Sequence, residues 1–344
     1  MERNNHTITI NKISDEAKAS LRTRVISALV GLMVVMPAIL MGDWLFFGEI
    51  IVVLAISIYE LVTCAKKKYT IWLYIFTFIA TFAICFWPII RNVILSDVTW
   101  NGHIYPYFDS MNVPVVVIVV SLFALLYIIM WDENFTVRDA CFIFAIGMLV
   151  AVGFQSIVFL RLYPATLLPE VTNEGFYNTT NTFTSMLLFI YMLVAVFATD
   201  IGAYFTGMLF GKKKINPRIS PKKTWAGFWG GIIISLVLSA SFAFILAANG
   251  YPILPVKEGF SIFDLDHWYN IIILSVIIPL FATLGDFVFS AVKRYYEIKD
   301  FGNILPGHGG ALDRLDSVIF AASTIAIFIS IVEAICYGNP GYIL

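Results

Sequence analysis

Two polar stretches in the C-terminal half of the chain carry residue types that suit phosphate chemistry. Residues 210–227 read FGKKKINPRISPKKTWAG, and residues 290–316 read SAVKRYYEIKDFGNILPGHGGALDRLD. Lys and Arg alone are enough to keep a loop on the cytoplasmic side of a membrane. Such retention does not require the Gly, Pro, His and paired acidic residues that are interleaved with these cations. The two stretches therefore indicate a site rather than a retention signal alone.

Four aspartates lie in or beside these stretches. Asp200 and Asp286 fall within apolar segments, where a charge costs about 2.5–3.5 kcal/mol on insertion scales, so each should face a cavity or a partner. Asp313 and Asp316 share one helix face if a helix begins near them. Carboxylates without His or Cys partners suit hard cations such as Mg²⁺. The four aspartates predict a cation site near the inner surface of a membrane.

Phosphate-binding groups accompany these acids. Asp286, Ser290 and Lys293 are spaced i, i+4 and i+7 and share one helix face. The Gly-His-Gly-Gly stretch 307–310 lets the backbone approach a ligand, and N–H groups at the start of the next helix could face an anion. His308 is equally compatible with a structural and a catalytic role. With no Walker A or Rossmann motif present, the combination predicts metal-assisted phosphoryl or nucleotidyl transfer.

The composition shows which elements must position these residues. Of 344 residues, 60% are hydrophobic and 13% are charged, and the net charge is −1. Soluble domains are about half apolar and a quarter charged. This composition excludes a soluble enzyme, a disordered chain and a nucleic-acid-binding protein, so we expect no nucleic-acid partner. It predicts an all-α polytopic integral membrane protein, without a disulfide framework or zinc site from its four cysteines.

Nine apolar segments are long enough to span a membrane, since a spanning helix needs about 20 residues. They are residues 25–42, 45–64, 70–90, 113–131, 139–160, 184–209, 228–248, 268–288 and 317–337. Lys and Arg concentrate in alternate connections, and the other connections carry only Arg91, Arg161 and Lys257. The positive-inside rule then predicts a cytoplasmic N-terminus and an external C-terminus.

These spans suggest three regions. Residues 1–24 form a cytoplasmic N-terminal segment, residues 25–180 hold about five spans, and residues 181–344 form a catalytic region of about four spans. The acids Glu49, Glu60 and Glu333 also fall in predicted spans. We interpret Glu60 as a local ion-pair partner of the nearby lysines 66–68 and place all three glutamates outside the site.

The residues that carry the strongest family resemblance come from the second polar stretch. They form the run Ser290-x-Val292-Lys293-Arg294-x₄-Lys299-Asp300-x-Gly302-x₂-Leu305-Pro306-x-His308-Gly309-Gly310-x₂-Asp313-Arg314-Leu315-Asp316. This run closely resembles the signature of phosphatidate cytidylyltransferases, also called CDP-diacylglycerol synthases. Upstream, Asp200-Ile-Gly-Ala-Tyr204 and Ser220-Pro-Lys-Lys-Thr-Trp225 resemble a second conserved region of that family. Two positions depart from the family pattern: Ala311 replaces a larger aliphatic residue, and Ala226 stands where Glu is common.

The resemblance implies a reaction in phospholipid biosynthesis. The family joins CTP and phosphatidate to give CDP-diacylglycerol and pyrophosphate, by attack of the lipid phosphate on the α-phosphorus of CTP. The implied enzyme is a homodimer in the bacterial cytoplasmic membrane, surrounded by membrane lipid, with its active site facing the cytoplasm. The implied cofactor is Mg²⁺, with room for a second, monovalent cation such as K⁺.

The resemblance also implies roles for individual residues. The principal metal ligands would be Asp286 and Asp313, with Asp200 and Asp316 either as further ligands or as residues that support the ligands. Lys223, Lys293 and Arg294 would join Asp286 and Asp313 as catalytic residues. The substrate-binding set would be Ser220, Lys222, Lys223, Ser290, Lys293, Arg294, Lys299, His308, Gly309, Gly310 and Arg314.

Two other functions are compatible with parts of the pattern. A CTP-dependent polyprenol or lipid kinase is also polytopic with basic inner loops, but it transfers the γ-phosphoryl group and releases CDP. A secondary transporter uses intramembrane acids, but its polar residues usually lie at the midplane between repeats. Here the polar residues lie towards one surface and no repeat is visible, so the sequence favours the cytidylyltransferase.

Overall fold

Long apolar helices form most of the chain in the computed structural model, which describes residues 30–31, 33–97, 113–166, 179–249, 251, 253, 268–304 and 309–337. The helices are α2 (Asp43–Thr63), α3 (Ile71–Asp97), α5 (Val113–Ile129), α6 (Val137–Thr166), α7 (Thr179–Phe210), α8 (Trp225–Ala248), α9 (Trp268–Tyr295) and α10 (Leu312–Tyr337). Residues 33–41 are helical as well. Two short strands, β1 (Lys214–Asn216) and β2 (Ser220–Thr224), lie between α7 and α8.

Six of the helices within the described ranges are long and apolar enough to cross a membrane. They contain the segments Trp44–Thr63, Val137–Arg161, Ser185–Phe210, Trp225–Ala248, Trp268–Tyr295 and Leu312–Ile331. Two shorter apolar helices cover Ile71–Trp87 and Val115–Ile129. The predicted span 25–42 lies partly outside the described residues. The polytopic, mainly helical architecture is confirmed, while the count of nine spans and the side of each terminus stay predictions.

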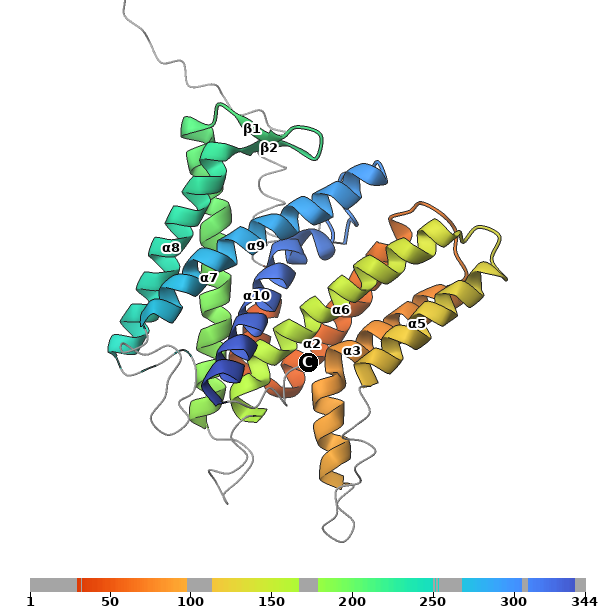
Figure 1. Cartoon of the computed structure of the whole chain (residues 1–344), viewed down its shortest axis with the longest axis horizontal. Helices are drawn as coiled ribbons and strands as arrows, with labels where there is room; N and C mark the ends of the chain where they lie inside the picture. Colours follow the sequence, from red (N-terminus) through yellow and green to blue (C-terminus); the bar gives the residue numbers. More distant parts are fainter. Residues whose placement is uncertain are drawn as a thin grey trace, which may run out of the picture.

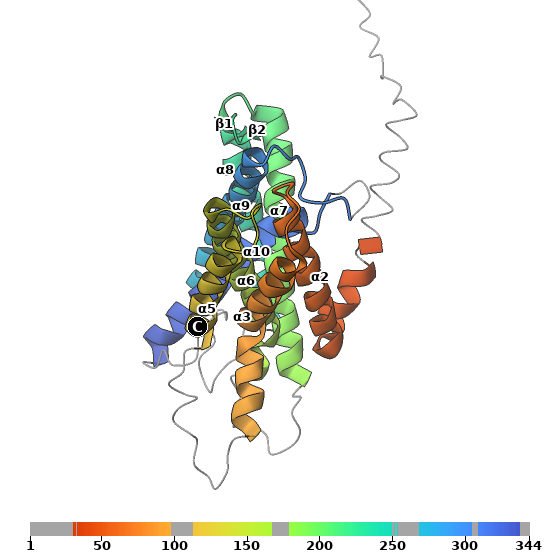
Figure 2. The ribbon, with the colours of Figure 1, turned by 90° about the vertical axis from the view of Figure 1, so that its right-hand side faces the viewer.

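A β-hairpin interrupts the helices at one end of the bundle, where the sequence analysis expected only a polar loop (Figure 1). Its antiparallel strands pair Lys214 with Thr224 and Asn216 with Ser220. Thr224 also caps α8, because its hydroxyl accepts a hydrogen bond of 3.1 Å from the N–H of Gly227. The hairpin is thus attached directly to the first turn of α8. Figure 2 shows it at the same end of the bundle from a second direction.

Helices α7 and α8 pack closely because glycines face the neighbouring backbone. A Cβ added to Gly227 would lie 2.8 Å from the carbonyl oxygen of Ala203, and one added to Gly231 would lie 2.9 Å from that of Thr199. Small residues at such positions are typical of helix pairs in membranes. The close packing fixes the part of α7 that carries Asp200 beside the base of the hairpin.

Helix α10 connects the two halves of the bundle. It packs against α9 and α7 on one side and against α6 and α2 on the other. Its residues Ile319, Ala322 and Ile325 are fully buried in the core. The start of α10 therefore lies where elements from distant parts of the sequence meet.

The described basic segments gather at the end of the bundle that carries the hairpin. The Lys66 ammonium donates to the carbonyl of Glu297 at 3.1 Å, and Lys67 forms an ion pair of 2.6 Å with Asp139. Arg294 at the end of α9 donates to the carbonyl of Ile219 in the hairpin turn at 3.3 Å. Segments that the sequence analysis assigned to one membrane side thus lie together.

Candidate functional site

The hairpin and α9 meet through a lysine and an aspartate. The Lys223 ammonium lies 2.5 Å from Oδ2 of Asp286, and Ser290 donates a hydrogen bond of 3.1 Å to Oδ1 of the same carboxylate. The ammonium also lies 4.1 Å from the centre of the Phe287 ring. The Lys223 nitrogen is buried, but within the described part of the chain it makes no contact with hydrogen-bond geometry. An ammonium has three donors, so this nitrogen can still donate to an anionic ligand.

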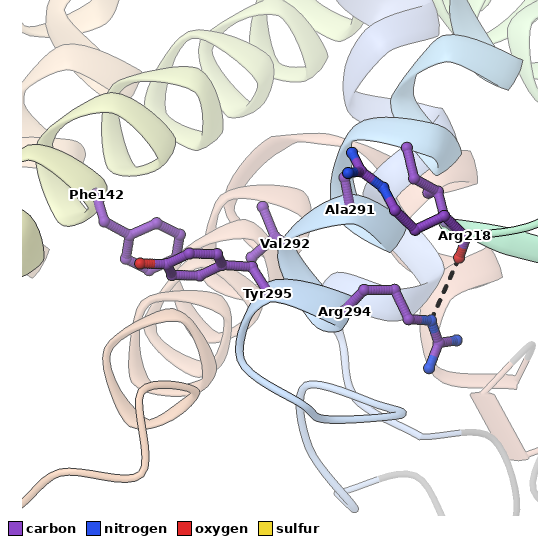
Figure 3. A pocket seen from close by; sticks show the side chains of 7 residues that line it. Phe142, Arg218, Ala291, Val292, Arg294 and Tyr295 are labelled. Carbon is purple, nitrogen blue, oxygen red and sulfur yellow. Dashed lines mark hydrogen bonds between the residues drawn. The ribbon is translucent and has the colours of Figure 1, made fainter.

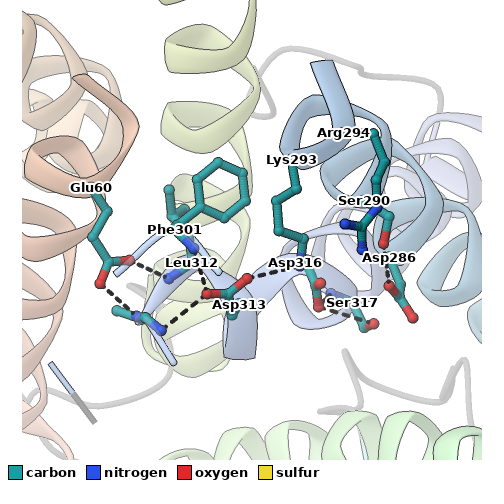
Figure 4. Close-up of polar contacts among 12 residues, drawn as sticks. Glu60, Asp286, Ser290, Lys293, Arg294, Phe301, Leu312, Asp313, Asp316 and Ser317 are labelled. Carbon is teal, nitrogen blue, oxygen red and sulfur yellow. Dashed lines mark hydrogen bonds and ion pairs between the residues drawn. The ribbon is translucent and has the colours of Figure 1, made fainter. Parts of the chain in front are cut away.

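A second cation–carboxylate pair joins α9 to α10 (Figure 4). The Lys293 ammonium donates to Oδ1 of Asp313 at 2.8 Å. Oδ2 of Asp313 accepts from the backbone N–H groups of Phe301 at 2.8 Å and Gly310 at 3.0 Å. The Asp313 side chain is only 4% exposed. Asp313 therefore both neutralises Lys293 and holds together the two ends of the polar segment that precedes α10.

Two further aspartates lie within electrostatic range of Asp286. Asp200 on α7 interacts with Asp286 and with Lys223, and Asp316 on α10 interacts with both Asp286 and Asp200. Asp316 is buried, and one of its oxygens accepts a 2.7 Å hydrogen bond from the N–H of Ser317. The structure thus brings three of the four predicted metal-ligand carboxylates into one neighbourhood.

The donor chemistry fits a hard cation, but the described side chains do not form a closed cage. No three His, Cys, Asp or Glu residues in the described ranges lie close enough together to hold a metal ion. Asp286 and Asp313, the two principal candidates, each face a lysine ammonium instead. Carboxylate oxygens are the ligand type that a hard cation such as Mg²⁺ takes, so the donor chemistry of Asp286 and Asp313 is compatible with one.

A cavity of about 560 Å³ opens between the hairpin turn, α9 and α6. Figure 3 shows the guanidinium groups of Arg218 and Arg294 on one side of it and the rings of Phe142 and Tyr295 on the other. Guanidinium groups bind phosphate oxygens in a forked geometry, and the apolar wall suits hydrocarbon. The sequence analysis did not select Arg218, although its place in an Asn-Pro-Arg turn beside the basic strand was a usable signal. The lining residues are Phe142, Arg218, Ile219, Ala291, Val292, Arg294 and Tyr295.

The other predicted substrate-binding residues differ in their exposure. Ser220 in β2 is half-buried, whereas Lys222, Lys299 and Arg314 are exposed. Gly309 has a φ of 87°, which glycine adopts readily and other residues rarely adopt. His308 lies outside the described residues. The side chains that the structure brings into direct contact are therefore Lys223, Asp286, Ser290, Lys293 and Asp313.

The interpretation of Glu60 as a partner of Lys66–Lys68 is wrong. Its carboxylate accepts hydrogen bonds of 3.0 Å from the backbone N–H groups of Ala311 and Leu312. The nearby Lys66 and Lys67 bind Glu297 and Asp139 instead. Glu60 is buried and points towards α10, whose first N–H groups have no acceptor within their own helix.

Comparison with known proteins identifies the type of enzyme to which this site belongs. Residues 22–332 match the pattern of the cytidylyltransferase family. The chain belongs to this family. The phosphatidate cytidylyltransferase of Bacillus subtilis (strain 168) is 34% identical over 220 residues, which cover 63% of this chain and 68% of the relative. That of Staphylococcus haemolyticus (strain JCSC1435) is 29% identical over 311 residues, which cover 90% of this chain and 99% of the relative.

These matches confirm the resemblance found in the sequence. The cytidylyltransferase pattern extends well beyond the polar stretches and covers the N-terminal helices as well. The chain is therefore an enzyme of the phosphatidate cytidylyltransferase family. Membership in a cytidylyltransferase family favours neither of the alternative functions, lipid kinase or transporter.

Proposed function

We propose that the chain transfers the cytidylyl group of CTP to phosphatidate, producing CDP-diacylglycerol and pyrophosphate for phospholipid biosynthesis. The observation that carries this proposal is the pair of cation–carboxylate contacts, Lys223–Asp286 and Lys293–Asp313, in and beside the stretches that resemble the family. The basic segments at the same end support a position at the inner surface of the bacterial cytoplasmic membrane. There the site can meet both a cytosolic nucleotide and a lipid head group.

The reaction forms one P–O bond and breaks another. A phosphate oxygen of phosphatidate forms a bond to the α-phosphorus of CTP. The bond from that phosphorus to the oxygen bridging to the β-phosphorus breaks, and its electron pair leaves with pyrophosphate. The attacking oxygen is already ionised near neutral pH, so no strong general base is needed. The main barrier is the repulsion between two anions, which fixed positive charge reduces.

The cations of the site are suited to that task. Lys223 and Lys293 sit in partly buried surroundings, where charge–charge interactions are stronger than in water. We propose that both ammonium groups contact substrate phosphates during the reaction. A bound Mg²⁺, held by Asp286 and Asp313 with Asp200 and Asp316 as further ligands, would neutralise phosphate charge and polarise the reacting phosphorus. We also propose that the site takes a second, monovalent cation such as K⁺ and that the enzyme is a homodimer.

The cavity beside Arg294 is the proposed position of the phosphatidate head group. Its two arginines, Arg218 and Arg294, supply charge for a phosphate, and its apolar wall suits the first carbons of an acyl chain. The guanidinium of Arg294 is oriented by its hydrogen bond to the carbonyl of Ile219. The proposal thus separates a lipid side of the site, near Arg218, from a nucleotide side, near Lys223.

The test uses the purified chain in detergent with phosphatidate, Mg²⁺ and CTP labelled at either the α- or the γ-phosphorus. Cytidylyl transfer puts the α-label into the lipid product and the γ-label into pyrophosphate. A CTP-dependent lipid kinase would instead transfer the γ-label to a lipid acceptor other than phosphatidate. Lipid chromatography separates these products, and absence of α-label in the lipid would refute the proposed function.

A further inference from the structure

Glu60 on α2 contacts the first turn of α10. Its two carboxylate oxygens accept hydrogen bonds of 3.0 Å each from the N–H groups of Ala311 and Leu312 (Figure 4). Glu60 is only 1% exposed. Its helix precedes the signature of the family by most of the length of the chain. Neither the function derived above nor the family resemblance gives this residue a role.

The start of α10 needs such a partner. The residue before Leu312 is Ala311, which has no side-chain oxygen to accept a hydrogen bond from the first turn. Helix N-termini present unpaired N–H groups and favour a negative charge nearby. Glu60 supplies both the acceptor and the charge from another helix. It does for α10 what the side chain of a capping Ser or Asp usually does from the residue that begins the helix.

Two glycines of the signature match the space that Glu60 occupies. A Cβ added to Gly310 would lie 2.5 Å from Oε2 of Glu60, and one added to Gly302 would also overlap its carboxylate. The end of a glutamate side chain can usually move aside. Here it is buried and held by two hydrogen bonds, so movement would break the contacts to α10. Glu60 therefore explains why positions 302 and 310 are both glycine.

The same contacts lead to the reacting groups. Gly310 donates its N–H to Asp313 at 3.0 Å, and Asp313 accepts from Lys293 at 2.8 Å. Glu60 accepts from the N–H of Ala311, and Asp313 accepts from the N–H of the preceding residue, Gly310. The two carboxylates therefore bind neighbouring N–H groups of the same stretch of backbone. Without Glu60, the backbone beside Gly310 would be less constrained, and the Gly310 N–H would be a weaker support for the Asp313 carboxylate.

We infer that Glu60 is a positioning residue for cytidylyl transfer, which acts by fixing Gly302 and residues 310–312 so that Asp313 and Lys293 face the substrates. This inference rests on the proposed function. Glu60 itself touches neither of the groups assigned to substrate phosphate. Its effect should therefore appear in the rate of the chemical step rather than in substrate affinity.

The experiment compares Glu60→Gln with the wild-type chain and with Glu49→Gln, a matched change on the same helix at a residue outside the site. Gln keeps the size of the side chain but replaces one acceptor oxygen with a donor that faces an N–H group. We expect kcat to fall at least about tenfold, because a hydrogen bond to a charged group is lost. KM for CTP and for phosphatidate should stay within about threefold, and Glu49→Gln should behave like the wild type.

A second measurement follows the segment without using activity. Lys299 is exposed, so trypsin can cut after it. We expect cleavage there to be faster in Glu60→Gln than in the wild type and in Glu49→Gln, while the melting temperature of the bundle stays similar. Loss of folded protein with an unchanged kcat per folded molecule would overturn the inference, as would an unchanged cleavage rate.

A double-mutant cycle tests the link to the glycines. Gly302→Ala should lower kcat by itself, because its methyl group displaces the Glu60 carboxylate. In a Glu60→Ala background the methyl group has space, so we expect little further loss. Losses that multiply would mean that the two positions act independently and would contradict the inference. A wild-type chain that transfers no α-label to phosphatidate would instead refute the proposed function, so the two failures are distinguishable.

Discussion

The Lys223 ammonium lies 2.5 Å from Oδ2 of Asp286, and this pair connects the hairpin to the C-terminal part of α9. Both side chains are partly exposed, at 23% and 31%. The pair is thus more accessible than the almost fully enclosed Lys293–Asp313 pair, although the Lys223 nitrogen itself is buried. The accessible pair is suited to exchange partners when substrate and cation bind. The enclosed pair has an additional task, because Asp313 also accepts hydrogen bonds from the N–H groups of Phe301 and Gly310 before α10.

Lys223→Gln should lower kcat/KM for CTP or phosphatidate by at least about tenfold, because a contact between a cation and a phosphate would be lost from the transition state. Lys213→Gln is the matched control, since Lys213 is exposed in the same loop. Assays per folded molecule compare the two. Equal effects in both variants would mean that the charge of the loop matters only for topology.

Asp286→Asn should lower turnover at least about a hundredfold, because Asn keeps the shape of the side chain but not the charge that holds a cation. Folding should be little affected, since Asp286 is partly exposed and its neighbours are polar. Activity is measured over a range of Mg²⁺ concentrations beside the thermal unfolding curve. Near-normal turnover at low Mg²⁺ would remove Asp286 from the proposed metal site.

Asp313→Asn should reduce both activity and stability. The change leaves the enclosed Lys293 ammonium without its counter-charge, and breaking a buried pair on one side costs about 3–5 kcal/mol. A lower melting temperature and faster tryptic cleavage after Lys299 should accompany the loss of turnover. Unchanged stability would show that Asp313 does not hold the segment in the way the contacts suggest.

Removal of divalent cations by a chelator should abolish turnover, and Mg²⁺ should restore it. The reason is that the carboxylates of the site offer oxygen ligands to a hard cation, while none of the cysteines in the described ranges joins them. The melting temperature should change little, because the lysines neutralise Asp286 and Asp313 in the absence of a metal. Full activity in the chelator would rule out the metal-assisted mechanism.

Tags at the two termini test the predicted topology. We expect a protease added to intact cells from outside to remove a C-terminal tag and to spare an N-terminal one, because Lys and Arg concentrate on the N-terminal side. Permeabilised cells provide the control in which both tags are accessible. A protected C-terminal tag in intact cells would show that the number of spans is not nine.

The sequence by itself determined the class of the molecule and the position of its polar segments. Long apolar runs predict helices, and the spacing of Asp286 and Ser290 predicts that they share a helix face, on which the structure has a hydrogen bond between them. These features are local: they depend on residues within one helix or one loop. The family signature is local in the same sense, because it lies in a single stretch of the chain.

Contacts between distant elements were decided by the tertiary structure. Glu60 and Leu312 are 252 residues apart, and nothing in the spacing of either segment indicates that α2 supplies the acceptor for α10. The sequence analysis assigned Glu60 to its nearest lysines because a sequence shows separation along the chain but not distance in space. The hairpin and the cavity at Arg218 likewise depend on how α6, α8 and α9 pack. Helical periodicity fixes which residues share a face of one helix, but the partner of that face is set by the packing of the whole bundle.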